Sequence, residues 1–451
     1  MNILVISEEV SPVNSVAAIR WTKISKYLSI NWNYSIDILT TKKHYRNKSG
    51  ATFRKYDSTL ANDLVYISNY IEIKESARTR MFDLSFRLAD IAIKGFRLIR
   101  GFANNKTSST KSKIGCNESP MYLRIYGKCL EKKGDCYLRS AMSGSINWQK
   151  YDVIISSFGP SWVHKLANQI KTEYPNILWI ADFRDPTAGI PDVPRSLKDK
   201  YVSFVCKNAD AVTATSDGTL RALNVPNNIK SQVITNGFEP QEMDSRLRRR
   251  NDKFIISYTG TMYKEGDRKS DLTPLFDALT ELVLDKDIDK NDILIIYIGR
   301  SSDLFQKQIC KYSELNWENR GWVSREESMD LQDSSSLLVI SVWNTKSSNG
   351  VIAAKLFEYF CSDVPLLGLC SGDLSNSTTK RIISCSKMGY CYEEASKEKD
   401  YTELKEYVKN KYLEWKAFGF SKSEANREFI DSFSYEQIAN KYNELIGLLH
   451  K

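Results

Sequence analysis

The sequence predicts an α/β protein built from two doubly wound parallel sheets. Short apolar runs rich in β-branched residues alternate with helix-like segments from one end of the chain to the other. Most of these runs are apolar on both faces, which is typical of strands that helices cover on both sides. The alternation restarts near residue 253, after the charged segment QEMDSRLRRRND, so we expect a second domain to begin there.

Ten apolar runs are predicted to be strands. They are Asn2–Ser7, Ser35–Thr40, Asp152–Ser157, Ile177–Ala181, Ala211–Ala214, Ser231–Thr235, Phe254–Tyr258, Ile293–Ile298, Leu337–Val342 and Val364–Gly368. We expect one domain over residues 1–240, a linker over 241–252 and a second domain over 253–425.

The last segment, 426–451, is predicted to form a helix that returns to the first domain. Ser434 and Gln437 have the spacing of a capping box, in which the first side chain accepts a backbone hydrogen bond from the second residue. An apolar stripe follows, formed by Ile438, Tyr442, Leu445 and Leu449.

The composition excludes several classes of protein. A length of 451 residues with 42% hydrophobic and 11% aromatic residues supports two large cores and excludes a disordered chain. No run of about 18 apolar residues occurs, so we expect no membrane span. The start, MNILVISEEV, predicts a strand rather than a signal peptide. The nine cysteines include no CxxC pair, which favours reduced thiols over a zinc site.

The net charge of +9 is concentrated in the first third of the chain. Residues 1–150 hold 25 lysines and arginines against 12 aspartates and glutamates, and residues 74–139 hold 15 against 6. One interpretation of 74–139 is an insertion that packs on its domain. Another is a helix on an anionic membrane surface. Nucleic acid is a weaker alternative, because no recognised binding motif accompanies the charge.

Two strand ends in the first half carry residues suited to chemistry, and ligands of doubly wound domains bind at such ends. In SSFGPSWVHKLANQI, His164 lies one turn into the helix that follows a strand. In ILWIADFRDP, a strand runs into Asp182, Arg184 and Asp185, which suit a polar acceptor or a base. The alternatives are a core histidine and an ion cluster that satisfies itself.

Two further segments are candidates for binding an anion. After the first strand, SEEVSPVNSVAAIRW predicts a helix start near Ser15, whose backbone N–H groups can receive an anion; an ordinary β–α turn is the alternative. In YTGTMYKEGDRKSDLTP, Gly260 and Thr261 precede Arg268 and Lys269, and small residues beside cations suit a diphosphate. A normally charged surface loop is the alternative.

The stretch SSNGVIAAKLFEYFCSDVPLL places two charges in an apolar helical face. Lys355 and Glu358 are three residues apart, so they are neighbours on one side of a helix. Burying a charge without a partner is costly, so each needs one. The two either pair with each other or face a ligand, with Lys355 on a phosphate and Glu358 accepting the hydroxyls of a ribose.

These segments, taken in order, resemble the retaining glycosyltransferases of family four, which have the GT-B fold. The segments are MNILVISEE, YDVIISSFGPSWVH, ILWIADFRDP, YTGTMY, IYIG, NRGWVS and NGVIAAKLFEYFCSDVPLLGL. The likeness covers nearly the whole chain apart from about 74–139, and ADFRDP and KLFEY are its most specific parts. It implies two Rossmann-like domains that face each other across a cleft, with the donor held by the second.

The resemblance also implies roles for particular residues. The donor-binding set is Ser15, Gly260, Thr261, Arg268, Lys269, Arg320, Val323, Gly350, Val351, Lys355, Leu356 and Glu358. The catalytic set is His164, Asp182, Arg184 and Glu358, and the acceptor-binding set is Asp182, Arg184 and Asp185. Within the donor set, Glu358 would hold the ribose, Arg268 and Lys269 the diphosphate, and the turn 320–323 the nucleobase.

The chain departs from the family pattern at two places. The family has a Glu eight residues before Glu358, where this chain has Gly350. Asn14 and Ser15 stand where the family commonly has Gly-Gly.

The sequence therefore predicts a retaining glycosyltransferase of cell-surface polysaccharide biosynthesis. It would move a sugar from a nucleotide-sugar to a saccharide or a polyprenyl-diphosphate-linked saccharide, without a metal or other cofactor and without nucleic acid. We expect a cytoplasmic protein that also contacts the inner membrane face through 74–139. The alternatives are a catalytically degenerate GT-B subunit that acts as a binding partner, which Gly350 favours, and a nucleotide-sugar 2-epimerase.

Overall fold

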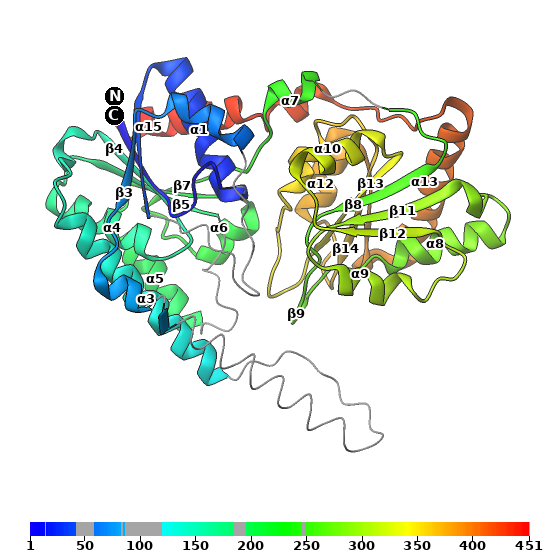
Figure 1. Ribbon diagram of the computed structural model, residues 1–451, viewed down its shortest axis with the longest axis horizontal. Helices are drawn as coiled ribbons and strands as arrows, with labels where there is room; N and C mark the ends of the chain where they lie inside the picture. Colours follow the sequence, from blue (N-terminus) through cyan, green and yellow to red (C-terminus); the bar gives the residue numbers. More distant parts are fainter. Residues whose placement is uncertain are drawn as a thin grey trace. The chain divides into compact units, whose positions relative to one another are not determined.

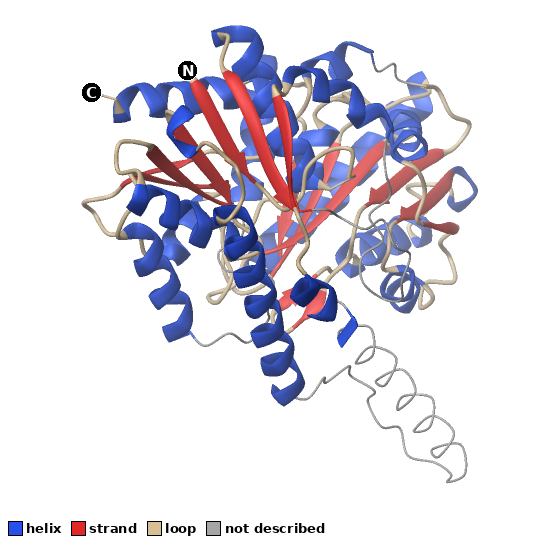
Figure 2. Ribbon diagram, turned by 60° about the vertical axis from the view of Figure 1, so that its left-hand side comes forward, coloured by secondary structure: helices blue, strands red, loops and turns tan. Residues whose placement is uncertain are grey.

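The computed structural model describes residues 1–13, 15–41, 58–82, 84–85, 120–184, 195–245 and 249–450. Its contacts divide the chain into two compact units. The first comprises 1–213, 223–232 and 445–451, and the second comprises 214–222 and 233–444. Each unit is built around one sheet of strands flanked by helices (Figures 1 and 2). The sequence-based boundaries of the domains stay a prediction.

The sheet of the first unit has the strand order β3-β2-β1-β4-β5-β6-β7. Its strands are β1 (Asn2–Ile6), β2 (Ser35–Thr41), β3 (Asn69–Ile73), β4 (Val153–Ser157), β5 (Leu178–Phe183), β6 (Ala211–Ala214) and β7 (Lys230–Val233). The pairs from β3 through β5 are parallel. The intervening helices are α1 (Val16–Trp32), η1 (Ser58–Tyr66), α3 (Pro120–Met142), η2 (Trp148–Lys150), α4 (Trp162–Glu173), α5 (Arg195–Cys206) and α6 (Asp217–Leu223).

The sheet of the second unit has the order β12-β11-β8-β13-β14-β15, and all its pairs are parallel. Its strands are β8 (Phe254–Thr259), β11 (Ile293–Ile298), β12 (Trp317–Gly321), β13 (Leu337–Trp343), β14 (Leu366–Ser371) and β15 (Gly389–Glu393). A small antiparallel hairpin of β9 (Lys264–Glu265) and β10 (Arg268–Lys269) follows β8.

Helices cover both faces of this second sheet. They are α8 (Thr273–Leu284), α9 (Ser302–Ile309), α10 (Arg325–Ser334), α11 (Lys355–Tyr359), α12 (Thr378–Ser386) and α13 (Lys397–Phe418). Shorter or flanking helices are α7 (Pro240–Ser245), η3 (Lys290–Asp292), η4 (Glu394–Ser396), α14 (Arg427–Asp431) and α15 (Tyr435–Leu449). Figure 1 shows α10 and α12 on one side of the sheet and α8 and α9 on the other.

Alternating residues of the strands explain this two-sided cover. On β8, Phe254 and Ile256 pack into a core with α8, α9 and α13, whereas Ile255 packs with Leu331 of α10. On β13, the residues facing α11 and α12 are likewise apolar. Because both faces are buried, the interior strands of this sheet are mostly apolar on both faces, as in FIISYT of β8 and LLVISVW of β13. This arrangement confirms the predicted doubly wound sheets.

All ten predicted strands are present, with ends shifted by at most three residues. The sequence did not predict β3, β12 or β15, which are edge strands. An edge strand has one neighbour, and the residues of β12 alternate between partly buried and exposed. Its sequence, WENRG, has no apolar run, so the pattern used for interior strands does not detect it.

The C-terminal helix begins where the capping spacing predicts. The hydroxyl of Ser434 accepts a hydrogen bond from the backbone N–H of Gln437 at 3.3 Å. Ile438, Tyr442 and Leu445 of the stripe have no exposed surface. Residues 445–451 group with the first unit and 435–444 with the second, and the predicted return of this helix to the first domain stays a prediction.

The end of the basic insertion packs on its own unit. Gly134 of α3 lies against Trp162 of α4, and the rings of Tyr137 and Trp162 are 5.8 Å apart. Lys165 of α4 forms an ion pair with Glu131 of α3 at 3.1 Å. For this part the packing interpretation holds, whereas residues 86–119 lie outside the described part of the chain. In the described residues, no helix is both long and apolar enough to cross a bilayer.

The contact at Gly134 gives a stability prediction. A Cβ atom there would lie 2.8 Å from Cβ of Trp162, so Gly134→Ala forces α3 and α4 apart and should lower the free energy of unfolding by about 1–3 kcal/mol. Gly447 of α15 has nothing within 4 Å of such an atom, so Gly447→Ala should gain about 0.5–1 kcal/mol of helix propensity. Denaturant unfolding of both variants measures this, and equal stabilities would contradict the close packing of α3.

Candidate functional site

Glu358 is held at the carboxyl end of the second sheet by a short, otherwise buried helix. Its neighbours on α11, Leu356, Phe357 and Tyr359, lie in the core. Burial by itself would raise the pKa of Glu358. The positive charges of Lys355 and Arg325 and a hydrogen bond from Gln332 outweigh burial and lower the pKa to about 2. The carboxylate is therefore ionised at every physiological pH.

Three side chains surround this carboxylate, Lys355 from α11 itself and Gln332 and Arg325 from α10. Oε1 of Glu358 accepts hydrogen bonds from Nζ of Lys355 at 2.7 Å and from Nε2 of Gln332 at 2.6 Å. Arg325, at the start of α10, forms an ion pair with Glu242 of α7, in which its Nη2 donates to both carboxylate oxygens at 2.7 and 2.8 Å. The mutual pair between Lys355 and Glu358 thus exists, and it belongs to a larger network of charges.

The end of β8 is tied to the same helix. The hydroxyl of Tyr359 lies 3.1 Å from the backbone nitrogen of Thr259 and 3.0 Å from its hydroxyl. The next residue, Gly260, runs so close to Gly299 that a Cβ atom on Gly299 would lie 2.0 Å from the Gly260 carbonyl oxygen. The predicted turn Gly260–Thr261 therefore lies in a tightly packed backbone layer at the carboxyl edge of the sheet.

Arg268 and Lys269 form the second strand of the β9–β10 hairpin and are exposed. Nζ of Lys269 pairs with the carboxylate of Asp271, which also accepts hydrogen bonds from Thr273 at the start of α8. This ion pair and these hydrogen bonds lower the pKa of Asp271 against the opposing effect of burial. The hairpin presents the two predicted cations just beyond the end of β8.

The remaining predicted donor residues are placed differently. Arg320 turns toward Glu318 on the same strand at 2.7 Å, and Val323 packs partly buried beneath α10. Leu356 has no exposed surface and belongs to the core. The carbonyl of Val351 accepts a hydrogen bond from Thr379 at 3.2 Å. The side chain of Leu356 therefore belongs to the core and holds α11 in place, and only its backbone could contact a ligand.

Gly350, where the family pattern has a Glu, is required by the backbone. Its φ angle of +67° lies in the left-handed region that favours glycine. A Cβ atom there would lie 2.5 Å from Cα of Gly218 and 2.6 Å from its nitrogen. A glutamate at position 350 is therefore incompatible with the packing of α6 against this loop within the second unit.

Asp182, at the end of β5, is fully buried with a partner that the sequence did not suggest. Its Oδ1 lies 3.1 Å from Nη2 of Arg20 on α1, and neither side chain is exposed. Ser157 and Thr213 also donate hydrogen bonds to the carboxylate, at 3.3 and 2.9 Å. Removing one member of such a buried pair costs about 3–5 kcal/mol. The only hint in the sequence was a charged residue at an apolar position of α1.

His164 lies inside an aromatic cluster of the first unit. It has no exposed surface, and its ring stacks on Phe158 and Tyr201 at 5.5 and 6.2 Å. Nδ1 is 2.6 Å from the hydroxyl of Ser156, and Nε2 has no hydrogen-bond partner among the residues that the structure describes. Burial and the nearby charge of Arg184 lower the pKa of His164 to about 3, although Asp182 opposes this, so the ring is neutral.

The other predicted residues of the first unit lie near the same strand ends. Nε of Arg184 donates to the carbonyl of Phe158 at 3.0 Å, so it bridges the ends of β4 and β5. Asp185 lies outside the described residues. The hydroxyl of Ser15 caps α1 by accepting from the N–H of Ala18 at 3.2 Å, which confirms the predicted start of that helix.

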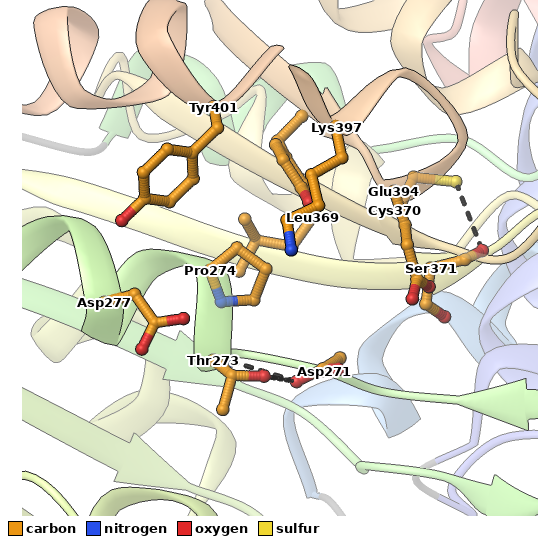
Figure 3. Close-up of a pocket in the computed structure, with 11 residues that line it drawn as sticks. Asp271, Thr273, Pro274, Asp277, Leu369, Cys370, Ser371, Glu394, Lys397 and Tyr401 are labelled. Carbon is orange, nitrogen blue, oxygen red and sulfur yellow. Dashed lines mark hydrogen bonds between the residues drawn. The ribbon is translucent and has the colours of Figure 1, made fainter. Parts of the chain in front are cut away.

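A cavity of about 140 Å³ opens at the same edge of the second sheet (Figure 3). Asp271, Thr273 and Pro274 line one wall, Leu369–Ser371 another, and Lys397 and Tyr401 of α13 a third. None of the predicted donor residues lines it, but two lining residues contact Lys269. Asp271 pairs with its ammonium group, and the hydroxyl of Ser371 donates to its carbonyl. In the described part of the chain, its acids form no group that could hold a metal ion. We place the candidate site at Glu358, where charges from three helices converge, rather than in this small cavity.

No protein-family model and no curated protein matches the sequence. Solved structures do match it. A structure named for trehalose-6-phosphate from E. coli, bound with UDP-2-fluoro glucose, is 11% identical with a TM-score of 0.60 and 99% coverage of both chains. The trehalose-6-phosphate phosphatase N-terminal domain of Candida albicans is 11% identical with a TM-score of 0.59, over 99% of this chain and 97% of that one.

A third match is a UDP-forming α,α-trehalose-phosphate synthase from Burkholderia xenovorans in complex with glucose-6-phosphate. It is 9% identical with a TM-score of 0.58, over 99% of this chain and 100% of that one. The chain has the GT-B fold. This confirms the predicted fold class, and at 9–11% identity the GT-B fold is what these proteins share with the chain.

The buried histidine predicts a pH dependence of stability. The unfolded chain protonates His164 near pH 6.5, whereas the folded protein keeps it neutral down to about pH 3. The unfolding free energy that the neutral imidazole contributes is therefore fully present well above pH 6.5. It is lost as the pH falls below 6.5, by about 1.4 kcal/mol per pH unit. Between pH 6.5 and 5.0 the wild type should lose about 2 kcal/mol more unfolding free energy than His164→Phe.

Denaturant unfolding at the two pH values measures this difference. His450→Gln serves as the control, because His450 is exposed. An equal loss of stability in the wild type and His164→Phe would contradict a neutral, buried imidazole.

Proposed function

We propose that the chain is a retaining glycosyltransferase of the family-four type, which moves a sugar from a nucleotide-sugar to a saccharide or lipid-linked saccharide. The main support is the ionised Glu358 carboxylate at the carboxyl edge of the second GT-B sheet. Ligands of doubly wound sheets bind beyond the carboxyl ends of the strands. The family resemblance around KLFEY supports the same assignment.

In this proposal Glu358 accepts hydrogen bonds from the two hydroxyls of the donor ribose. A carboxylate with a pKa near 2 stays an acceptor-only group, which suits a diol that brings two donors. Lys355 and Gln332 hold its Oε1 in a fixed direction. The site is thus already oriented before a ligand arrives, which reduces the entropy that binding must overcome.

The diphosphate leaves as the bond from the sugar carbon to the phosphate oxygen breaks, and negative charge grows on that oxygen. Arg268 and Lys269 of the hairpin, together with Lys355, would stabilise that charge electrostatically. The acceptor hydroxyl attacks the sugar carbon and its proton passes to the departing phosphate. The diphosphate and the sugar would lie against the backbone of Gly260, Thr261, Gly350 and Val351. The 320–323 turn would lie beside the nucleobase.

The acceptor would bind to the first unit near the ends of β4 and β5. Since Asp182 and His164 have no exposed surface, we propose that they act by holding these ends, and that Arg184 and Asp185 contact the acceptor. The basic segment 74–139 would bring the enzyme to an anionic membrane that carries a lipid-linked acceptor.

A second candidate function is a catalytically inactive GT-B subunit that binds a partner. Gly350 favours it, because the family places a Glu by the donor sugar at that position. Hydrolysis of a nucleotide-sugar without acceptor, at a rate that falls in Lys269→Ala, would exclude the inactive subunit.

Thermal unfolding with UDP-, GDP-, ADP- and CMP-sugars tests the donor site. We expect one nucleotide class to stabilise the wild type, by roughly 2.7 kcal/mol at 100 times its dissociation constant. Glu358→Ala should lose most of this stabilisation because the ribose hydroxyls lose their acceptor.

Glu414→Ala is the matched control, because Lys411 and Glu414 form an ion pair with the same i,i+3 spacing on α13, at 2.9 Å. It should keep the full stabilisation. The donor proposal would be wrong if no nucleotide stabilised the wild type, or if Glu358→Ala and Glu414→Ala responded alike.

A further inference from the structure

The β9–β10 hairpin is too small to hold its own shape. Each strand has two residues, and two-stranded hairpins alone are at best marginally stable in water. Yet this hairpin carries Arg268 and Lys269, whose cations need a defined position if they are to meet a diphosphate. Something outside the hairpin must fix it.

Asp267, at the tip of the hairpin, joins the hairpin to another loop of the second unit. Its Oδ2 accepts hydrogen bonds from the hydroxyl of Thr345 at 2.7 Å and from the hydroxyl of Ser347. Both donors belong to the loop after β13, nearly 80 residues further along the chain. These two hydrogen bonds lower the pKa of Asp267 more than any other interaction does, so the acceptor is ionised and the bonds are charge-assisted.

The loop that receives Asp267 is itself closed by hydrogen bonds. Thr345 and Ser348 exchange backbone hydrogen bonds at 3.1 and 3.2 Å, which closes a tight turn. The hydroxyl of Ser348 accepts a further hydrogen bond from the indole N–H of Trp343 at 2.9 Å. The same loop continues through Gly350 to α11, which bears Lys355 and Glu358.

The other end of the hairpin is held as well. The hydroxyl of Ser371, at the end of β14, donates to the carbonyl of Lys269, and the N–H of Tyr263 donates to the hydroxyl of Ser270 at 3.0 Å. These hydrogen bonds hold the base of the hairpin and leave its tip to other contacts. Asp267 supplies such a contact at the tip, through Thr345 and Ser347.

We propose that Asp267 is a positioning residue, which fixes the β9–β10 hairpin on the Thr345–Ser348 loop so that Arg268 and Lys269 face the diphosphate of a bound nucleotide. The inference rests on the proposed donor site. It adds that one carboxylate, that of Asp267, fixes the position of the cation-bearing hairpin relative to the loop that leads to α11. Neither the sequence pattern nor the family resemblance assigned a role to Asp267.

A purely electrostatic role for Asp267 predicts the opposite effect. An anion next to Arg268 weakens the attraction for a diphosphate, so removing its charge should strengthen binding. A positioning role predicts that Asp267→Ala weakens binding, whereas Asp267→Asn keeps it, because an amide oxygen still accepts from Thr345 and Ser347. The two variants therefore separate position from charge.

Titration calorimetry with UDP, GDP and ADP, and with uridine, guanosine and adenosine, measures the effect. For the diphosphate that binds the wild type, Asp267→Ala should weaken binding about tenfold, with Asp267→Asn within about threefold of wild type. The affinity for the matching nucleoside should not change. Asp373→Ala is the control, because Asp373 accepts from the N–H of Lys346 on the same loop at 3.2 Å, and among the described residues it has no hydrogen bond or ion pair with the hairpin.

The outcomes separate this inference from the proposed function. Equal or tighter diphosphate binding by Asp267→Ala, in a protein whose binding still falls in Lys269→Ala, would overturn the positioning role alone. Loss of nucleoside affinity in Asp267→Ala would also overturn it, because the damage would then not be confined to the hairpin. If wild type bound none of the three diphosphates, the proposed function and this inference would both fail.

Discussion

The ionised carboxylate of Glu358 is the constraint on which the carboxyl edge of the second sheet depends. The helix that carries it is buried on its other faces through Leu356 and Phe357, and the Glu358 side chain itself is only 20% exposed. An isolated charge at such a place is costly, and the chain offsets that cost with Lys355 of α11 itself and with Arg325 and Gln332 of α10. Those elements are thereby fixed relative to one another at the point where strands β8 and β13 end.

Backbone packing imposes a second constraint on the same edge. Gly299 and Gly350 are positions where a side chain would collide with neighbouring backbone. The departure from the family pattern at Gly350 thus has a steric origin in this chain: the loop before α11 is pressed against Gly218, and no larger residue fits. In the proposed function, backbone amides near Gly350 would make the contact to the donor sugar that the family pattern assigns to this glutamate.

The sequence predicted the interior of both sheets better than their edges. Interior strands such as Leu337–Val342 are mostly apolar on both faces, so composition alone detects them. The edge strand Trp317–Gly321 has two of its five residues exposed and the other three only partly buried. The spacing of Lys355 and Glu358 predicted that they lie on one helical side and left open whether they pair or face a ligand, and the structure shows the pair. The partner of Asp182 was not predictable in this way. Arg20 is 162 positions away, and only the tertiary fold brings the two together.

The central claim is that the second unit binds a nucleoside diphosphate through Glu358 and the β9–β10 hairpin. A crystal structure of the protein with the nucleotide selected by thermal unfolding tests it most directly. The account predicts both ribose hydroxyls within hydrogen-bond distance of the Glu358 carboxylate and the diphosphate oxygens beside Arg268 and Lys269. A nucleotide bound instead in the cavity between Asp271 and Lys397, with Glu358 still joined only to protein groups, would contradict it.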